Sequence, residues 1–179
     1  MSALSFRKAA MEEAEQIAVM VNESYRGETS RQGWTTEADL LDGLRTDAEE
    51  VRRLISSDVS MVLVCLSGAE LVGSVCLEKM DDQAHLGMFV VKPMLQGRGI
   101  GKQLLAAAEY AAQREWAVGK LAMAVITCRH ELIAFYERRG YQRKGVFREF
   151  PLNPDVWTPK VQELRLEILE KPVLTLSVP

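Results

Sequence analysis

Apolar and polar positions divide the chain into short strands and amphipathic helices. Apolar side chains recur at helical spacing over residues 10–24 and again over residues 100–112, with charged and polar side chains between them. Two four-residue segments, 36–39 and 46–49, have the form of a capping box. We expect each segment to open a short helix, with Leu40, Leu41 and Leu44 on the apolar face of the first.

Apolar or alternating runs outside these helices are typical of strands. They cover residues 4–8, 61–66, 71–77, 84–91, 121–126, 141–147 and 161–169. The predicted order is β-α-α-β-β-β-α-β-α-β-β, which indicates an α/β fold built on one mixed sheet. Residues 161–169 alternate cleanly and predict an edge or hairpin strand, whereas residues 174–179 fit no element.

Composition and charge indicate one globular domain over residues 1–179. Apolar residues make up 47% of the chain and charged residues 26%, which is enough apolar material for one core. The net charge of −3 gives no reason to expect a nucleic-acid partner. No apolar stretch approaches the ~18 residues of a membrane span, and the N-terminus lacks the apolar segment of a signal peptide. We therefore expect a cytoplasmic protein without a membrane partner.

The cysteines predict neither a disulfide nor a metal site. Cys65, Cys76 and Cys128 are odd in number and widely separated, and each lies in an apolar run. No Cys-x-x-Cys motif or histidine cluster accompanies them. We expect three reduced, buried thiols and no bound metal.

A glycine-rich stretch, Gln96-Gly97-Arg98-Gly99-Ile100-Gly101, follows the strand at residues 84–91 and opens the helix at residues 100–112. The first turn of a helix has backbone N–H groups without intrahelical partners, and the helix dipole favours negative charge there. Alternating glycines leave room for a phosphate close to these donors. The stretch therefore predicts an anion-binding loop, and a pyrophosphate is the ligand that fits it best.

The spacing of the glycines separates this loop from two other phosphate-binding motifs. A Walker A loop would need Ser or Thr after Gly101-Lys102, where Gln103 stands. A Rossmann fingerprint would need its third glycine at Lys102 and would lie near the first strand of its domain. Both spacings count against a nucleotide-binding or oxidoreductase domain.

What remains is the pattern Gln/Arg-x-x-Gly-x-Gly/Ala, and with it the chain resembles the GCN5-related N-acetyltransferase (GNAT) family. Residues 131–141 resemble the helix of that family that ends in Phe/Leu-Tyr-x-x-x-Gly-Phe/Tyr, here Phe135-Tyr136 and Gly140-Tyr141. The resemblance covers residues 63–150 well and the N-terminal third in outline. It implies a GNAT-like acyl-CoA N-acyltransferase fold.

The resemblance also implies a set of contacts to acetyl-CoA. The pyrophosphate would be held by Gln96, Gly97, Arg98, Gly99, Ile100, Gly101 and Lys102. Backbone groups of Phe89, Val90 and Val91 would pair with the pantetheine arm, and an N–H there could polarise the thioester carbonyl. Arg129 stands where relatives often have Asn beside the pantetheine. It could pair with a CoA phosphate, bind an acidic substrate group, or be a solvated charge.

Tyr136 is the general-acid candidate, because the tyrosine at this place in many relatives points its hydroxyl at the thioester sulfur. A phenol with a pKa near ~10 is a suitable donor to a thiolate. The alternative is a tyrosine that only packs. The general base stays open, because the position where many relatives carry Glu is Gly87 here. His85 and Glu78 lie near enough on the predicted strands to reach a bound amine.

The acceptor pocket implied by the resemblance lies between residues 25–34 and residues 148–157, which carry aromatic and polar side chains. The predicted function is transfer of an acetyl group from acetyl-CoA to a primary amine of a small molecule, amino acid or peptide, by direct attack in a ternary complex. The alternative, motivated by Gly87 and Arg129, is a non-catalytic acyl-CoA-binding regulatory module. The alternation of residues 161–169 also permits a homodimer formed through sheet edges.

Overall fold

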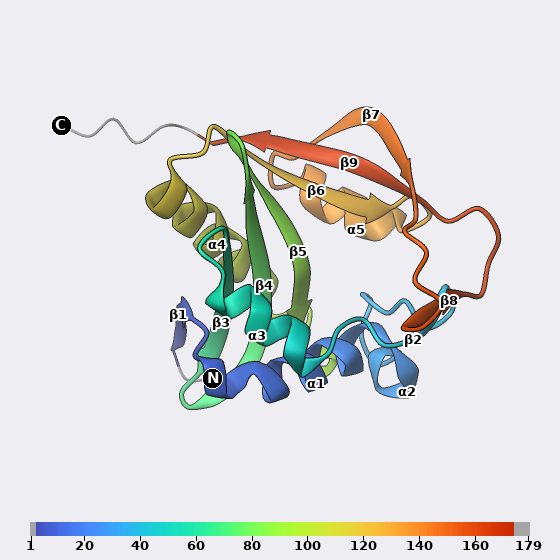
Figure 1. The fold of residues 1–179 in the computed structure, drawn as a ribbon, viewed down its shortest axis with the longest axis horizontal. Coiled ribbons are helices and arrows are strands. Elements are labelled where there is room, and N and C mark those ends of the chain that lie inside the picture. Colours follow the sequence, from blue (N-terminus) through green and yellow to red (C-terminus); the bar gives the residue numbers. More distant parts are fainter. Residues whose placement is uncertain (1–2, 174–179) are drawn as a thin grey trace.

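A seven-stranded mixed sheet forms the centre of the computed structural model, which describes residues 3–173 (Figure 1). Its strands lie in the order β1-β3-β4-β5-β6-β9-β7, and all neighbours are antiparallel except β5 and β6. The strands are β1 (Leu4–Lys8), β3 (Ser60–Ser67), β4 (Glu70–Met80), β5 (Gln83–Val91), β6 (Lys120–Ile126), β7 (Gln142–Glu149) and β9 (Arg165–Pro172). A separate two-stranded sheet pairs β2 (Leu41–Gly43) with β8 (Trp157–Pro159).

Helices cover both faces of the seven-stranded sheet. They are α1 (Ala14–Tyr25), α2 (Gly27–Ser30), α3 (Ala48–Ser56), α4 (Ile100–Trp116) and α5 (His130–Glu137), with the 3₁₀ turns η1 (Met11–Glu13) and η2 (Pro93–Leu95). The pleat of a strand sends alternate side chains to opposite faces. In β3, Leu63 and Cys65 therefore join one core with α4 and α5, whereas Val62 and Val64 join a second core with α1 and α3.

Strands β5 and β6 separate part of the way along the sheet. Their parallel pairing covers only residues 83–85 against residues 120–122 (Figure 1). Beyond this point β5 stays paired with β4, and β6 stays paired with β9. The pairs Ser74–Val90 and Cys76–Gly87 leave one extra residue in β5, where Met88 has a left-handed backbone with φ 44°. This β-bulge bends the strand where it diverges from β6.

The segment after α2 does not form the helix predicted over residues 36–44, and that prediction is wrong. Leu41 begins β2, which pairs with β8. Gly43 (φ 92°) approaches the neighbouring segment so closely that a Cβ atom would lie 2.1 Å from the Val156 carbonyl oxygen. Asp39, which would close the capping box, forms an ion pair with Arg31 instead. The helix predicted from residues 46–49 is present as α3.

The last strand was predicted as an edge or hairpin strand. β9 pairs antiparallel with β7, the preceding strand of this sheet, as in a hairpin, but it lies between β6 and β7 and is not an edge. The outer strands of the described sheet are β1 and β7. The alternation of residues 161–169 therefore no longer supports edge pairing, and a homodimer stays a prediction without that support. The unassigned residues 174–179 lie outside the described part of the chain.

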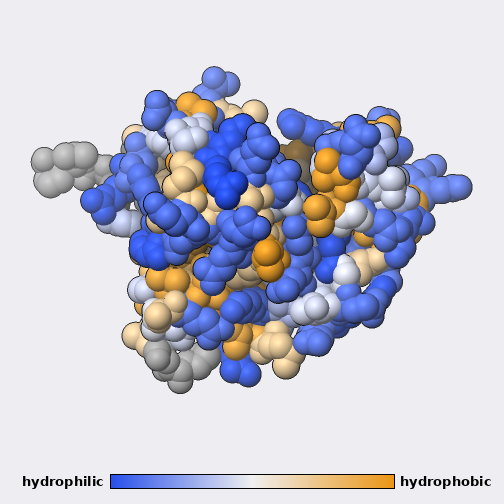
Figure 2. Space-filling model, turned by 60° about the horizontal axis from the view of Figure 1, so that its bottom comes forward, coloured by the Kyte–Doolittle hydropathy of each residue, from blue (hydrophilic) through white to orange (hydrophobic). Residues whose placement is uncertain are grey.

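The three cysteines are free thiols, but not all are buried as expected. Cys65 and Cys76 lie in the core, whereas Cys128 is exposed, because it lies in the turn after β6. Figure 2 shows a mainly hydrophilic face on which apolar side chains gather in small groups, as on most protein surfaces. Among residues 3–173, no helix is both long enough and apolar enough to cross a membrane.

Candidate active site

The glycine-rich loop joins β5, through η2, to the start of α4. The helix begins at Ile100, and Gly99 is its N-cap residue. Gly97 and Gly99 have left-handed backbones, with φ 77° and φ 82°, which other residues rarely adopt. A Cβ atom at either position would meet none of the described atoms within 4 Å. The loop therefore borders open space.

Backbone N–H groups of the loop point to an anion as ligand. Within residues 3–173, the amides of residues 97–102 donate to no backbone carbonyl, and the next amide, of Gln103, donates to the Gly99 carbonyl at 3.3 Å. The dipole of α4 adds positive potential at the same place. Arg98 and Lys102 flank the loop and are exposed. Loop geometry, orphan amides and flanking cations together fit a pyrophosphate.

Gln96 supports the loop from the protein side. Its amide nitrogen donates to Thr35 Oγ1 at 2.7 Å and to the Val91 carbonyl at 3.0 Å. Its Oε1 accepts a hydrogen bond from the Trp34 N–H at 2.9 Å. Gln96 therefore connects the end of β5 to the segment after α2, a structural role that its place in the loop sequence did not predict.

A cavity of about 420 Å³ begins at this loop. Besides Gln96, Gly97, Gly99, Gly101 and Lys102, it is lined by Trp34, Thr35, Phe89, Val91, Leu132, Phe135, Arg138 and Arg139. Trp34 packs against Phe135 with ring centroids 5.7 Å apart, and the Arg139 guanidinium lies 3.5 Å from the Phe135 centroid. Neither Trp34 nor the two arginines, Arg138 and Arg139, was predicted to line this cavity. Trp34 was expected in the acceptor segment at residues 25–34, but the fold brings its ring against Phe135 of α5.

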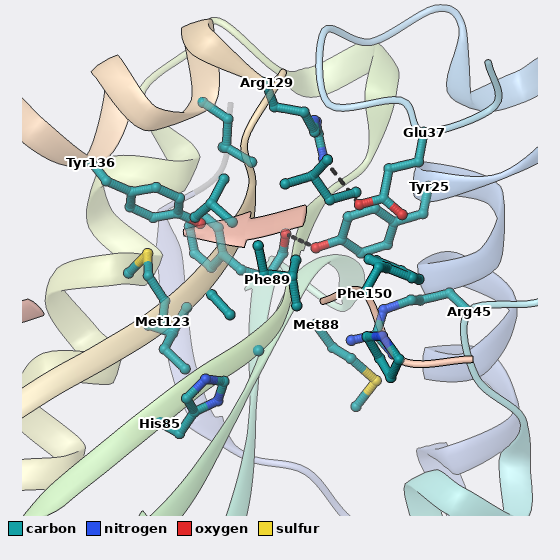
Figure 3. Close-up of a pocket in the computed structure, with 18 of the residues that line it drawn as sticks. Tyr25, Glu37, Arg45, His85, Met88, Phe89, Met123, Arg129, Tyr136 and Phe150 are labelled. Atoms are coloured by element: carbon teal, nitrogen blue, oxygen red, sulfur yellow. Dashed lines mark hydrogen bonds and ion pairs between the residues drawn. The ribbon is translucent and has the colours of Figure 1, made fainter. Parts of the chain in front are cut away.

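A second cavity, of about 250 Å³, lies where β5 and β6 separate (Figure 3). Tyr25 and Arg26 come to it from the first of the two expected acceptor segments, and Phe150, Pro151 and Trp157 come from the second. Other lining residues come from β5, β6 and α5. Phe89 and Leu132 line both cavities, so the two cavities are neighbours across these side chains.

Tyr136 points its hydroxyl toward the second cavity from α5 (Figure 3). Its side chain is buried, and its ring packs edge-on against Phe135 and Tyr141. Burial raises the pKa of Tyr136 above its ordinary value, and the nearby Tyr25 acts in the same direction. The hydroxyl is therefore protonated at neutral pH.

The hydroxyl of Tyr25, in the first acceptor segment, donates a hydrogen bond to the Phe89 carbonyl at 2.9 Å (Figure 3). Burial, with a smaller contribution from the Glu37 carboxylate, raises the pKa of Tyr25 to about 12. Because Phe89 belongs to the bulged part of β5, this bond fixes the diverging strand to the end of α1. One of the backbone groups assigned to the pantetheine arm thus already has a partner.

His85 and Gly87 line the second cavity from β5, whereas Glu78 does not. Glu78 lies opposite His85 on β4 and is exposed. Burial lowers the pKa of His85 below its ordinary value; Arg148 adds to this decrease and the Glu78 carboxylate opposes it. A Cβ atom at Gly87 would meet none of the described atoms within 4 Å. The place where relatives carry Glu is therefore open space here.

Glu37 connects two buried arginines, Arg129 and Arg26, at another wall of the second cavity. Figure 3 shows its pair with Arg129. Its Oε1 lies 3.1 Å from Arg129 Nη1, and its Oε2 lies 3.3 Å from Arg26 Nη2. Arg129, a candidate for a CoA phosphate in the sequence analysis, thus lines this cavity and not the one at the glycine-rich loop. Arg45 lines the same cavity. No local pattern marked Arg26 or Arg45, because the fold brings them together from different elements.

The family of the protein follows from a comparison of its sequence with family models. The model described as the acetyltransferase (GNAT) family matches residues 28–141, which include the glycine-rich loop and Tyr136. The match covers more than half of the chain, so the protein belongs to the GNAT family of acetyltransferases. The resemblance inferred from the two motifs is confirmed. A comparison with curated proteins found no match.

Solved structures of acetyltransferases share the fold. A GNAT acetyltransferase from Streptococcus pneumoniae is 18% identical, with 96% of this chain and 100% of that chain covered and a TM-score of 0.67. The PaiA N-acetyltransferase from Thermoplasma acidophilum, in complex with coenzyme A, is 19% identical, with 96% and 99% covered and a TM-score of 0.69. A spermidine N-acetyltransferase from Vibrio cholerae, in complex with CoA and spermine, is 17% identical, with 94% and 95% covered and a TM-score of 0.68. The predicted GNAT-like fold is therefore confirmed.

Proposed function

We propose that the protein is an acetyl-CoA-dependent N-acetyltransferase that acetylates a primary amine by direct attack in a ternary complex. The observation that carries this proposal is the meeting of two cavities at Phe89 and Leu132. One cavity begins at an anion-binding loop, and the other presents His85 and Tyr136. Two substrates bound in these cavities would meet beside groups able to accept and donate a proton.

Acetyl-CoA supplies the acetyl group as a thioester, and the loop cavity has the groups to hold it. The orphan amides of residues 97–102 would bind the pyrophosphate, with Arg98 and Lys102 beside it. The diverging part of β5, Phe89 to Val91, would direct the pantetheine arm toward the second cavity.

His85 is the base that the geometry favours over Glu78, because only His85 lines the second cavity. An aliphatic amine has a pKa of ~10.4 and arrives protonated, so a base must remove a proton before attack. The lowered pKa of His85 keeps its imidazole neutral at pH 7, ready to accept that proton. Much of the remaining acceleration comes from holding the two reactants in place.

Tyr136 provides the proton for the leaving sulfur. As the amine nitrogen bonds to the acetyl carbon and the carbon–sulfur bond breaks, the hydroxyl of Tyr136 donates its proton to the sulfur. The nitrogen, positively charged after the attack, releases its extra proton to solvent, and Tyr136 regains a proton from solvent. The raised pKa of Tyr136 ensures that this proton is present at neutral pH. The products would be an N-acetylated amine and CoA with a free thiol.

A paired measurement of stability and turnover tests the proposal. Acetyl-CoA at ~100-fold excess over its Kd should stabilise the fold by ~2.7 kcal/mol, and thiol release should then depend on an added amine. Stabilisation without turnover on a broad panel of amines would favour the alternative, a regulatory acyl-CoA-binding module, which the absence of a side chain at Gly87 motivates. Absence of stabilisation would contradict both. A cytoplasmic location, a single domain over residues 1–179, a homodimer and the lack of a metal remain predictions.

A further inference from the structure

The second cavity has an excess of positive charge. Its lining includes three arginines, Arg26, Arg45 and Arg129, but Glu37 is the one carboxylate among its described lining residues. Both oxygens of Glu37 are already engaged, one with Arg129 and the other with Arg26. Glu37 therefore has little capacity left to attract a cationic substrate, and the wall around it is positive.

Several guanidinium donors on this wall have no partner among residues 3–173. They are Nε and Nη1 of Arg26 and Nη2 of Arg129. The two side chains are only 6% and 8% exposed, so bulk solvent has little access to these donors. A buried charged donor without a partner lowers stability. An anionic ligand in the cavity would satisfy these donors.

Arg45 adds a third cation whose place is fixed by the backbone. The N–H groups of Arg45 and Thr46 both donate to Asn22 Oδ1, at 2.7 Å and 3.2 Å. In the described part of the chain, the Arg45 side chain has no carboxylate within ion-pair distance, and it extends toward the cavity (Figure 3). Burial lowers the pKa of Arg26, the Glu37 carboxylate opposes this decrease, and the charge of Arg45 adds to it, as expected for two like charges near the same cavity.

We propose that the acceptor is a primary amine that also carries a carboxylate, and that Arg26, Arg45 and Arg129 hold this carboxylate while the amine faces His85. This inference rests on the proposed function of the same site. A planar guanidinium binds a carboxylate through two parallel hydrogen bonds, and arginine is therefore the side chain best suited to this role. A polyamine, in contrast, would bring further positive charge to a wall with three arginines and one glutamate.

The test compares matched amines that differ only in the carboxylate. For each of several side chains, thiol release is measured with the α-amino acid, its carboxamide and the decarboxylated amine. We expect kcat/KM to be ~10-fold or more higher for the amino acid. A dipeptide with the same N-terminal residue, whose carboxylate lies farther from the amine, separates a free amino acid from a peptide N-terminus as the source.

Arg45→Gln tests the proposed preference for a carboxylate. Of the three arginines, Arg45 is the one whose substitution disturbs the fold least. Arg45 has no described ion pair to lose, so the variant should fold and keep the KM for acetyl-CoA. The KM for the amino acid should rise ~10-fold, and any change in the KM for the carboxamide should be much smaller. The matched control is Arg52→Gln, an arginine on α3 that is half-exposed and does not line the cavity.

A binding measurement separates failure of this inference from failure of the proposed function. N-acetyl amino acids and N-acetyl carboxamides are added to the protein with CoA, and the shift in melting temperature is recorded for wild type and Arg45→Gln. If the N-acetyl amino acids raise the melting temperature, the N-acetyl carboxamides do not, and Arg45→Gln abolishes the shift, the carboxylate site is supported even without turnover. Equal or faster turnover of decarboxylated amines would overturn the site and leave the acetyltransferase standing. Neither turnover nor stabilisation would contradict both.

Discussion

Burial keeps the Tyr136 hydroxyl protonated at neutral pH. Removal of its oxygen atom tests whether Tyr136 acts as the general acid. Tyr136→Phe removes the hydroxyl and keeps the ring that packs on Phe135 and Tyr141. Because general acids contribute ~100-fold or more, kcat should fall by at least that factor, while the KM for acetyl-CoA changes little. Tyr110→Phe, on an exposed tyrosine of α4, is the control. A kcat unchanged from wild type would assign Tyr136 to packing alone.

If His85 is the general base, kcat/KM should decrease at acidic pH. Only the neutral imidazole accepts a proton, so activity falls as the pH falls through the pKa of His85. Burial lowers this pKa below the ordinary ~6.5, and the acidic limb should therefore have its midpoint below pH 6.5. In His85→Gln the limb should disappear and kcat should decrease.

Glu78→Gln distinguishes His85 from Glu78 as the general base, because the two assignments predict different changes in the pH dependence of kcat/KM. The Glu78 carboxylate raises the pKa of His85 against the effect of burial. Its removal should therefore move the acidic limb of kcat/KM to lower pH and leave kcat at its optimum nearly unchanged. If Glu78 were the base, the same substitution would abolish activity. A pH–rate series on wild type and both variants decides between them.

At the scale of elements, glycine serves the loop between η2 and α4 in two ways: it adopts a left-handed backbone, and it leaves space for a ligand. Two substitutions separate these effects. Gly99 and Gly145 both have left-handed backbones, with φ 82° and φ 65°, and a Cβ atom at either would meet none of the described atoms within 4 Å. Alanine at either position should lower the free energy of unfolding by about 1 kcal/mol through backbone strain. Only Gly99→Ala, which places a methyl group at the anion-binding loop, should also lose stabilisation by acetyl-CoA. Equal ligand-induced shifts in both variants would contradict the placement of the pyrophosphate.

Elements formed by contiguous residues could be predicted from the sequence, whereas elements that need a distant partner could not. The loop between β5 and α4 was predictable because its strand, glycines and helix are contiguous, and local pattern decides such a unit. Residues 36–44 have a capping box but form a turn and β2, because β8 supplies a partner strand from far along the chain. The charges of the acceptor cavity could not be predicted from sequence for the same reason. The fold brings them together from separate segments: Arg26, Glu37, Arg45 and Arg129.

At the scale of the whole molecule, the divergence of β5 and β6 places one cavity next to the other. β5 continues toward the glycine-rich loop, while β6 turns away with β9 and β7 (Figure 1). The second cavity therefore depends on how firmly the β7–β9 pair is held. Arg143 on β7 donates two hydrogen bonds to the Glu167 carboxylate on β9, at 2.8 Å and 2.6 Å.

This pair predicts how global stability depends on pH. The Arg143 guanidinium lowers the pKa of Glu167, and Arg7 and Arg31 do the same for Glu13 and Asp39. Since each folded-state pKa lies below the unfolded value, the native state binds fewer protons. The stabilisation is complete above the unfolded pKa of about 4 and is lost as the pH falls through the lower, folded value.

Glu167→Gln isolates the share of this effect that belongs to the β7–β9 pair. At pH 7 the substitution should lower the free energy of unfolding by about 1–3 kcal/mol, because the Glu167 side chain is 2% exposed and loses a charged partner. Urea denaturation repeated down to pH 3 should show the difference from wild type shrinking as Glu167 becomes protonated. Glu149→Gln, on an exposed residue of β7, should show neither effect. A difference that stays constant with pH would mean that packing, not the ion pair, holds β7 to the sheet.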